Sequence, residues 1–384
     1  MNDPRILFAI ASLVGALAED AGGQAANRSP LPDPTGQHAV GRTTFEWIDA
    51  SRPDSTAPSR HREVVVWAWY PAAVHGSAAA QWMPGKWGEV FWSEYSKGHG
   101  GLGAPPDLSA IRTHAYADAP VEPSAQKYPL LLFAPGSGTT PLDYSGIIED
   151  IASHGYIVLG VESEFGRASV FADGRVVPGH DPVPRGGPGA PRSTEQAIRA
   201  WEDAAREFGK DLSFALTRLT ALRDAPLGRL ADLTRVGVFG HSLGGAAALQ
   251  CAHDDARVRA VVDIDGSPIW SARNGRLQKP VMILSAASTS LDYDGVLSGA
   301  MSAYHVRVAG TVHSFPSDIR VMPFAQPSTP NAQLIAPSRG LVITATFVEA
   351  FFGNYLLDQH AGILSGPSRE FPEVSFEKVP SPAR

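Results

Sequence analysis

The chain has 384 residues, a length that allows two or three domains or one large α/β domain with insertions. It contains 38 glycines and 32 prolines but only 18% charged residues, a composition typical of a loop-rich globular protein. A net charge of −7 gives no electrostatic attraction for nucleic acid or an anionic membrane, which excludes a basic binding groove. The single Cys251 excludes a disulfide scaffold, and no cysteine–histidine cluster has zinc-ligand spacing.

The first eighteen residues resemble an export signal. Residues 6–18 are apolar, Arg5 precedes them, and Ala18 provides a small side chain at a cleavage site. This apolar run is too short to span a bilayer, which needs about 20 residues. We therefore predict that residues 1–18 are a signal peptide of a secreted or periplasmic protein. The alternative is an N-terminal helix packed on a cytoplasmic protein.

The rest of the chain is expected to form one domain. Residues 19–36 are rich in glycine, alanine and proline and read as a flexible linker, so the domain should occupy residues 37–384. Inside it, three stretches break the hydrophobic periodicity and are predicted to be surface insertions: 50–61, 96–124 and 172–193.

Alternating strand and helix patterns fill the domain. Residues 43–49 and 63–70 are rich in β-favouring side chains and should pair as a hairpin. Continuous apolar runs, typical of strands buried on both faces of a parallel sheet, follow at 129–134, 156–161, 235–239, 258–264, 280–285 and 305–309. Helical periodicity occurs at 143–153, 194–223, 243–253 and 340–356. This alternation predicts an α/β fold with a mostly parallel central sheet, helices on both faces and loop insertions.

A predicted strand gives way to an apolar helix at the sequence Gly240-His241-Ser242-Leu243-Gly244. A G-x-S-x-G sequence at such a junction is the nucleophile elbow of α/β-hydrolases, in which a tight turn exposes the serine oxygen. The turn is tight enough to need glycine on both sides. We predict that Ser242 is a nucleophile. A glycine-rich turn with an incidental serine would leave the small residues after the elbow unexplained.

A serine hydroxyl needs a base to accept its proton, and in this fold the order along the chain is serine, acid, histidine. Among the histidines that follow the elbow, His313 lies in the loop after the last predicted strand, where the base belongs. His253 ends the elbow helix, His305 opens a strand, and His360 lies beyond the last helix. His241 adjoins the serine in sequence, but neighbours on an elbow diverge, so we expect a packing residue.

The acid can follow either of two strands. Asp265 ends the strand beside the elbow and is the preferred candidate, whereas Asp263 should point toward one face of the sheet. Asp292 and Asp294 follow the next strand and are the alternatives there. Whichever carboxylates are not used should be ordinary loop residues in solvent or capping a turn.

A tetrahedral intermediate also needs amide donors for its oxyanion. One should be the backbone N–H of Leu243, directly after the nucleophile. The other should come from the loop after the strand at 129–134, where flanking glycines allow close approach and make Ser137 the expected donor. The alternative is a type II turn without a catalytic role.

With these residues in place, the chain resembles the plasma-type (isoform II) platelet-activating factor acetylhydrolase family and its bacterial and fungal relatives, within the α/β-hydrolase superfamily. The matching sequences are Pro34-Thr35-Gly36, Val40-Gly41, Trp69-Tyr70-Pro71, 128–133, 150–158, 173–177 and the elbow. In that family the acid follows the strand after the elbow helix, as Asp265 does. The base lies in a Gly-x-x-His loop, as His313 does. Pro135 departs from the histidine of some members, which leaves the acyl preference open.

The resemblance implies a serine carboxylic-ester hydrolase that forms an acyl-enzyme, needs no metal or cofactor, and acts on short-acyl or phospholipid-type esters. Its partners would be a small-molecule or lipid ester and, transiently, a lipid interface, with no nucleic acid and no obligate protein partner. A polyester hydrolase with an open cleft is the second hypothesis. A catalytically silent binding protein with this fold is the third, and the complete serine, acid and histidine set argues against it.

Two insertions leave their roles open. Residues 76–118 and 166–193 could act as lids over the site or lie on the surface as simple loops. The first is rich in aromatic side chains that would suit either a flap over the acyl pocket or packing onto the sheet. These residues are Trp82, Trp87, Phe91, Trp92 and Tyr95.

Overall fold

The computed structural model describes residues 29–55, 57–183, 193–268, 277–325 and 334–378. The predicted signal peptide, most of the predicted linker and part of the insertion at 172–193 therefore lie outside the described residues. Within the described ranges, no helix is both long enough and apolar enough to cross a membrane.

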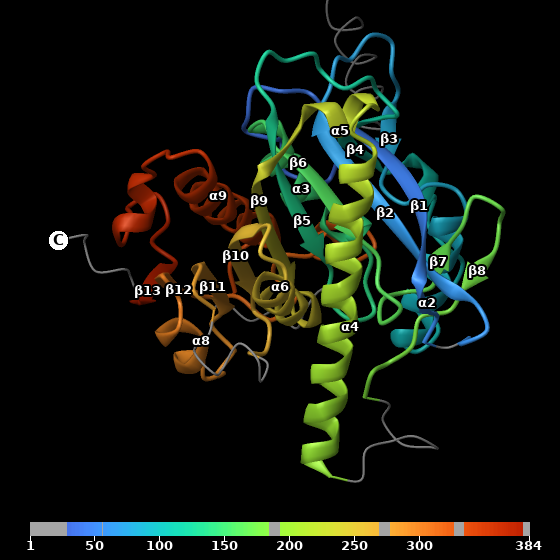
Figure 1. Ribbon diagram of the computed structural model, residues 1–384. Coiled ribbons are helices and arrows are strands. Elements are labelled where there is room, and N and C mark those ends of the chain that lie inside the picture. The colour runs from blue at the N-terminus through green and yellow to red at the C-terminus, as the bar shows by residue number, and fades with distance from the viewer. Residues whose placement is uncertain (1–28, 56, 184–192, 269–276, 326–333, 379–384) are drawn as a thin grey trace, which may run out of the picture.

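One sheet forms the centre of the molecule (Figure 1). Its strands are β1 (Val40–Pro53), β2 (His61–Pro71), β3 (Ala79–Gln81), β4 (Arg112–Ala117), β5 (Tyr128–Ala134), β6 (Ile157–Val161), β9 (Ala231–His241), β10 (Val258–Ile264), β11 (Pro280–Ala286), β12 (Ser302–Val308) and β13 (Val374–Lys378). Their order across the sheet is β13-β12-β11-β10-β9-β5-β6-β2-β1-β4-β3. The six neighbouring strands β6, β5, β9, β10, β11 and β12 pair in parallel. In contrast, β2 pairs antiparallel with β1 and β6, and β13 pairs antiparallel with β12. The predicted α/β class and mostly parallel sheet are confirmed.

Helices cover both faces of the sheet (Figure 1). They are α2 (Lys86–Gly98), α3 (Ser145–Ser153), α4 (Thr194–Ala221), α5 (Pro226–Leu230), α6 (Leu243–Asp254), α8 (Asp294–Ser298) and α9 (Pro337–Leu356). The alternating side chains of β5 explain the two layers. Leu131 and Phe133 pack in one apolar cluster with residues of α3 and α9, while Leu130 and Leu132 pack in the other with residues of α4 and α6. This two-sided burial is why β5 reads as a continuous apolar run.

The predicted strands and helices are all present, with shifts of a few residues at their ends. The expectation that 96–124 is only a surface insertion is wrong, because β4 within it joins the central sheet beside β1. Its residues Thr113 and Ala115 are buried in alternation, the burial pattern of a strand. A short ribbon pairs β7 (Ser169–Val170), just before the insertion at 172–193, with β8 (Val176–Val177) inside it.

The aromatic insertion packs onto the fold. Trp82 and Phe91 are fully buried, and their rings are in edge-to-face contact at 4.9 Å. The indole N–H of Trp82 donates to Asp318 Oδ2 at 3.3 Å, which ties the insertion to the segment that follows the predicted base. These contacts favour the packing alternative over a mobile aromatic flap.

Candidate active site

The turn between β9 and α6 places Ser242 at the carboxyl edge of the sheet. Ser242 has a φ of 57°, and glycine flanks it because side chains would not fit. A Cβ at Gly240 would lie 2.2 Å from the carbonyl oxygen of Gly244, and a Cβ at Gly244 would lie 2.1 Å from the oxygen of Ala134. The local structure is therefore the tight elbow that the sequence predicts, with the helix lying directly against β5.

The structure brings Ser242, His313 and Asp265 together. His313 Nε2 lies 2.9 Å from Ser242 Oγ, and His313 Nδ1 lies 2.6 Å from Asp265 Oδ2. Ser242 follows β9, Asp265 follows β10, and His313 lies in the loop after β12, so the three converge because parallel strands end at the same edge. The Asp265 side chain is fully buried, whereas that of His313 is 54% exposed.

Asp265 is held as a carboxylate by its hydrogen bonds. Its Oδ1 accepts the backbone N–H of Ala286 at 2.8 Å, and its Oδ2 accepts the Thr289 hydroxyl at 2.9 Å. Burial alone would raise the pKa of Asp265, but the hydrogen bonds from His313, Ala286 and Thr289 outweigh it and hold the pKa below its usual value. An ionised Asp265 fixes a proton on His313 Nδ1 and leaves Nε2 to accept one from Ser242.

The other candidate acids occupy different positions. Asp263 is fully buried beneath the elbow, where its Oδ1 accepts the backbone N–H of Gly266 at 2.7 Å. Asp292 lies in the loop before α8 and accepts the backbone N–H of Asp294 at 2.9 Å, as expected of a carboxylate capping a turn. Asp265 is therefore the candidate acid that the structure places against the histidine.

His241 is buried beside the base. Its Nε2 lies 2.8 Å from the carbonyl oxygen of His313, and its Nδ1 lies 2.8 Å from Tyr144 Oη. Burial, together with the charge of His313, lowers the pKa of His241 to about 3, so its ring is neutral at neutral pH. Because a carbonyl only accepts, Nε2 carries the proton and Nδ1 accepts the Tyr144 hydroxyl. His241 is a buried packing residue, as predicted, and it also holds the backbone of the candidate base through the His313 carbonyl. The sequence pattern did not indicate this contact.

The predicted oxyanion donors flank the serine. A Cβ at Gly136 would lie 3.4 Å from Ser242 Cβ, so the loop after β5 passes directly beside the elbow. On either side of Ser137, the N–H of Gly136 donates to Tyr144 Oη and that of Gly138 donates to the Phe165 carbonyl. These two bonds fix the Ser137 peptide. Leu243 begins α6, so its N–H is one of the first-turn donors that have no acceptor within the helix.

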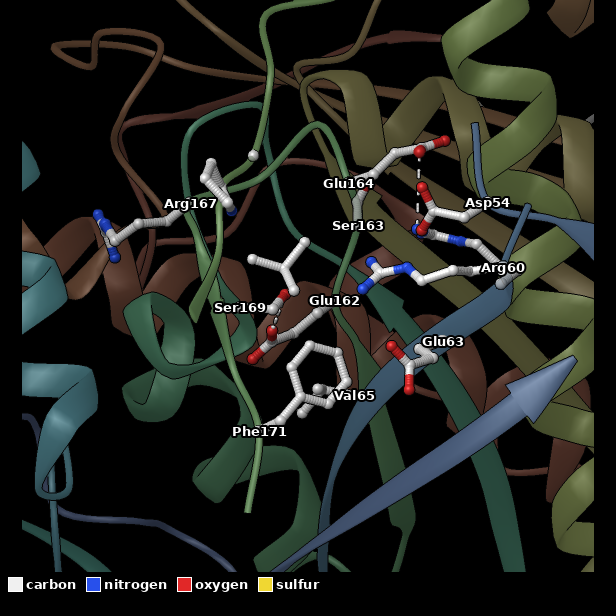
Figure 2. A pocket seen from close by; sticks show the side chains of 14 residues that line it. Asp54, Arg60, Glu63, Val65, Glu162, Ser163, Glu164, Arg167, Ser169 and Phe171 are labelled. Atoms are coloured by element: carbon white, nitrogen blue, oxygen red, sulfur yellow. Dashed lines mark hydrogen bonds and ion pairs between the residues drawn. The ribbon is translucent and has the colours of Figure 1, made fainter. Parts of the chain in front are cut away.

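A charged cavity is lined in part by Glu162, Ser163 and Glu164, the first residues of the loop that follows β6 (Figure 2). Its volume of about 20 Å³ has room for one water molecule. The Arg62 guanidinium lines it and pairs with Asp211 at 2.6 Å and Glu164 at 3.6 Å. The same loop accepts hydrogen bonds from the Gly138 N–H and the Ser137 hydroxyl at the Phe165 carbonyl. The charged cluster and the predicted oxyanion loop therefore contact the same segment, at Glu164 and Phe165 respectively.

Two larger cavities lie near the candidate triad, one lined by His313 itself and the other by His241 and Ser314. The first, of about 390 Å³, contains Ser242 and His313 together with apolar side chains, among them Ile198, Trp201, Leu243, Ala246, Pro268 and Leu291. The second, of about 600 Å³, is more polar and is lined in part by Glu94, Gly138, Thr139, Arg167, His241 and Arg320. Within the described ranges, no group of three or more histidine, cysteine or acidic side chains could hold a metal ion.

Comparison with known proteins gives three findings. Residues 23–171 match the family model for platelet-activating factor acetylhydrolase, isoform II. A probable 1-alkyl-2-acetylglycerophosphocholine esterase of Arthroderma benhamiae is 28% identical over 90% of this chain and 93% of its own length. A platelet-activating factor acetylhydrolase of Canis lupus familiaris is 25% identical over 67% of this chain, but the alignment spans only 60% of that enzyme.

A solved structure agrees in fold. A ferulic acid esterase from Streptomyces cinnamoneus superposes with a TM-score of 0.75 and 28% identity, covering 91% of this chain and 99% of the esterase. Both sets of relatives are named for the cleavage of carboxylic esters, and the family-model match at residues 23–171 ends before the elbow, the candidate acid and the candidate base. The chain is therefore a carboxylic ester hydrolase with the α/β-hydrolase fold and a relative of the isoform II platelet-activating factor acetylhydrolases.

Proposed function

We propose that the chain is a serine esterase with Ser242 as nucleophile, His313 as general base and acid, and Asp265 as the residue that orients the histidine. The observation that carries this proposal is the continuous hydrogen-bonded line from Asp265 Oδ2 through His313 to Ser242 Oγ, with separations of 2.6 and 2.9 Å. The amides of Leu243 and Ser137 would bind the oxyanion.

The reaction follows from this geometry. Ser242 Oγ attacks the ester carbonyl while His313 Nε2 takes its proton, and the carbonyl oxygen becomes an oxyanion facing the two amides. The tetrahedral intermediate collapses, His313 gives the proton to the departing alcohol, and an acyl-enzyme remains. Water then attacks the acyl carbon with His313 again as base, and collapse releases the carboxylic acid and restores the Ser242 hydroxyl.

The cavity beside Ser242 supports an apolar acyl group as the part of the substrate that binds there. Six large apolar side chains of the described residues are exposed, and three of them, Ile198, Trp201 and Leu291, line this one cavity. Such a concentration of exposed apolar surface marks a binding site. A short-acyl ester, as in the acetylated phospholipid named for the relatives, is the substrate class we favour.

An aromatic acyl group is the second candidate. Trp201 offers an indole face within the cavity that contains the nucleophile, and offset stacking on such a ring contributes about 0.5–1.5 kcal/mol beyond burial. The structurally similar ferulic acid esterase is named for an ester of that kind.

Covalent labelling tests the nucleophile. An alkyl organophosphonate should add one phosphonyl group to the wild-type protein, and peptide mass spectrometry should place it on Ser242. The Ser242→Ala variant should stay unlabelled, while Ser137→Ala, altered in the neighbouring loop, should still react. Labelling of another serine would reject the assignment.

An ester panel tests the substrate class. We would measure kcat/KM for nitrophenyl acetate, butyrate and octanoate, a 2-acetyl phospholipid, methyl ferulate, and release from a polyester film. Preference for the acetyl esters supports the favoured class, and preference for methyl ferulate supports the second. Trp201→Ala should reduce the ferulate rate about tenfold and the acetate rate less than threefold, because acetate is too small to reach the indole.

Lipid presentation and export belong to the same proposal. A lipid esterase should work faster on substrate above its critical micelle concentration than below it, which a rate titration across that concentration measures.

Export predicts a mature chain beginning at Glu19, which mass spectrometry of the protein from its native host would detect. An intact residue 1 in the cytoplasmic fraction would favour a packed N-terminal helix instead.

A further inference from the structure

A second carboxyl group lies directly beneath the candidate active site. Asp263, the penultimate residue of β10, is fully buried between the elbow helix and the turn that follows its own strand. A Cβ at Gly245 would lie 2.0 Å from Asp263 Oδ1, and a Cβ at Gly266 would lie 2.3 Å from the same atom. Glycine at both positions therefore makes room for this carboxyl group.

Asp263 is bonded to the turn that carries Asp265. Its Oδ1 accepts the N–H of Gly266 at 2.7 Å, one residue beyond Asp265. The backbone of Asp265 is left-handed, with a φ of 53°, and its own N–H donates to the Leu284 carbonyl at 2.9 Å. The Tyr293 hydroxyl donates to the carbonyl of Gly266 at 2.9 Å. The peptide groups on both sides of Asp265 are thus fixed, and Asp263 supplies one of the ties.

The surroundings of Asp263 favour a neutral carboxyl group. Among the described residues, its Oδ2 has no hydrogen-bond partner, so a charge there would be uncompensated. Burial raises the pKa of Asp263 to about 8, the Gly266 N–H opposes this, and the nearby Asp265 charge adds to it. The titratable groups that face it are Asp265 and the phenol of Tyr293, and on α6 it faces Gly245.

We infer that Asp263 is a positioning residue for the ester hydrolysis: as a neutral acid it holds the Gly266 peptide and thereby aims the Asp265 carboxylate at His313. This inference rests on the proposed function, because it takes Asp265 to be the acid of the triad. Asp263 acts through Asp265 and touches no reacting atom.

The inference predicts a difference between variants that keep the acceptor and variants that lose it. Asp263→Asn retains an oxygen for the Gly266 N–H, so kcat at pH 7 should stay within about threefold of wild type. Asp263→Leu removes the acceptor and keeps the branched shape of the side chain, although its methyl groups are larger than the carboxyl oxygens. Its kcat should fall about 10- to 100-fold with KM little changed, since a misplacement of about 1 Å in a catalytic group has effects of that size.

The pH–rate profile distinguishes positioning from mere support of the fold. Moving a negative charge away from the essential base should shift the acidic limb of kcat/KM to lower pH in Asp263→Leu, and the limb should stay in place in Asp263→Asn. Asp292→Asn, altered in a nearby loop, is the matched control and should move neither kcat nor the limb. Asp263→Ala provides the same measurement if the leucine variant does not fold.

Stability supplies an independent readout. The ordinary pKa of an aspartate is 3.8 and that of folded Asp263 is about 8, so between these values only the folded state keeps the proton. Asp263 therefore makes wild-type stability fall as pH rises from about 4 to about 8. Asp263→Asn should lose this part of the slope in urea unfolding.

Variants of Asp263 test its positioning role, whereas a variant of Asp265 tests the proposed triad itself. Full activity and an unshifted limb in Asp263→Leu or Asp263→Ala would overturn the positioning role. An unchanged stability slope in Asp263→Asn would overturn the neutral acid. High activity in Asp265→Asn would instead reject the triad, and with it the premise of the inference.

Discussion

Two clusters of charged side chains in this esterase contain equally short ion-pair contacts but have different roles. Asp265 lies 2.6 Å from His313 at the sheet edge, and Asp211 lies 2.6 Å from Arg62, which lines the small cavity of Figure 2. In the first cluster the histidine is 54% exposed and Ser242 faces a cavity of about 390 Å³. In the second, the Arg62 side chain is 8% exposed and the cavity, of about 20 Å³, has room for only one water molecule. A short carboxylate contact can serve catalysis when the groups it orients, as His313 and Ser242 here, remain accessible to a substrate. When all the groups are enclosed by protein, as around Arg62, the contact holds a loop in place.

The largest effect on activity should come from removing the Ser242 hydroxyl, the group of the first cluster that faces the cavity. Ser242→Ala should lower kcat by about 10⁶-fold, since members of a catalytic triad act as a unit. Thermal unfolding should show a folded protein, because the serine hydroxyl makes no contact essential to the core. Retention of more than a few per cent of activity in a preparation free of wild type would contradict the nucleophile assignment.

Neutralising the buried Asp265 carboxylate should lower activity less than the loss of the serine hydroxyl does, but still severely. Asp265→Asn removes the charge that orients His313 and should lower kcat by about 10⁴-fold. Asp292→Asn is its control and should change kcat by less than about threefold, because that carboxylate only caps a turn. The reverse ranking in a steady-state assay would move the acid to the later strand.

Breaking the closed cluster should affect stability rather than chemistry. Arg62→Met leaves Glu164 without this partner and should cost about 3 kcal/mol of unfolding free energy, near the low end for a buried pair because Arg52 also contacts Asp211. Arg175→Met removes an exposed pair with Glu63 and should change stability little. Equal midpoints for both variants in urea would show that burial does not distinguish these ion pairs.

The smallest effect should follow chelation. Charge stabilisation in the proposed mechanism comes from the amides of Leu243 and Ser137, so activity should persist in excess EDTA. An assay of nitrophenyl acetate hydrolysis before and after dialysis against the chelator tests this. Loss of activity that calcium or zinc restores would require a different source of charge stabilisation.

Much of the site could be predicted from the sequence because its constraints are local. The elbow needs glycine within a few residues of Ser242, and the chain order of serine, acid and histidine follows from successive parallel strands. The strand at 129–134 was equally clear, since burial on both faces leaves a continuous apolar run. For such features a short stretch of sequence contains the whole physical reason.

The rest depends on contacts between distant segments. β4 alternates over only six residues, and its place beside β1 comes from pairing with residues 75 positions earlier, as in Gly41 with Tyr116. The hydrogen bond of His241 to the carbonyl of His313 leaves no mark in composition or spacing. The space for the Asp263 carboxyl group depends in part on Gly245, which belongs to the elbow helix and not to the strand of Asp263.

The positive φ of Ser242 has an energetic consequence. Its φ of 57° and ψ of −121° place a side-chain-bearing residue where glycine is favoured, so the folded chain stores conformational strain of about 1–3 kcal/mol at the nucleophile. Ser242→Gly would relax that strain, whereas Ser242→Ala would keep it. Both variants should be inactive, yet the glycine variant should melt at the higher temperature. The protein gives up some of its own stability to hold one hydroxyl group in position for the reaction.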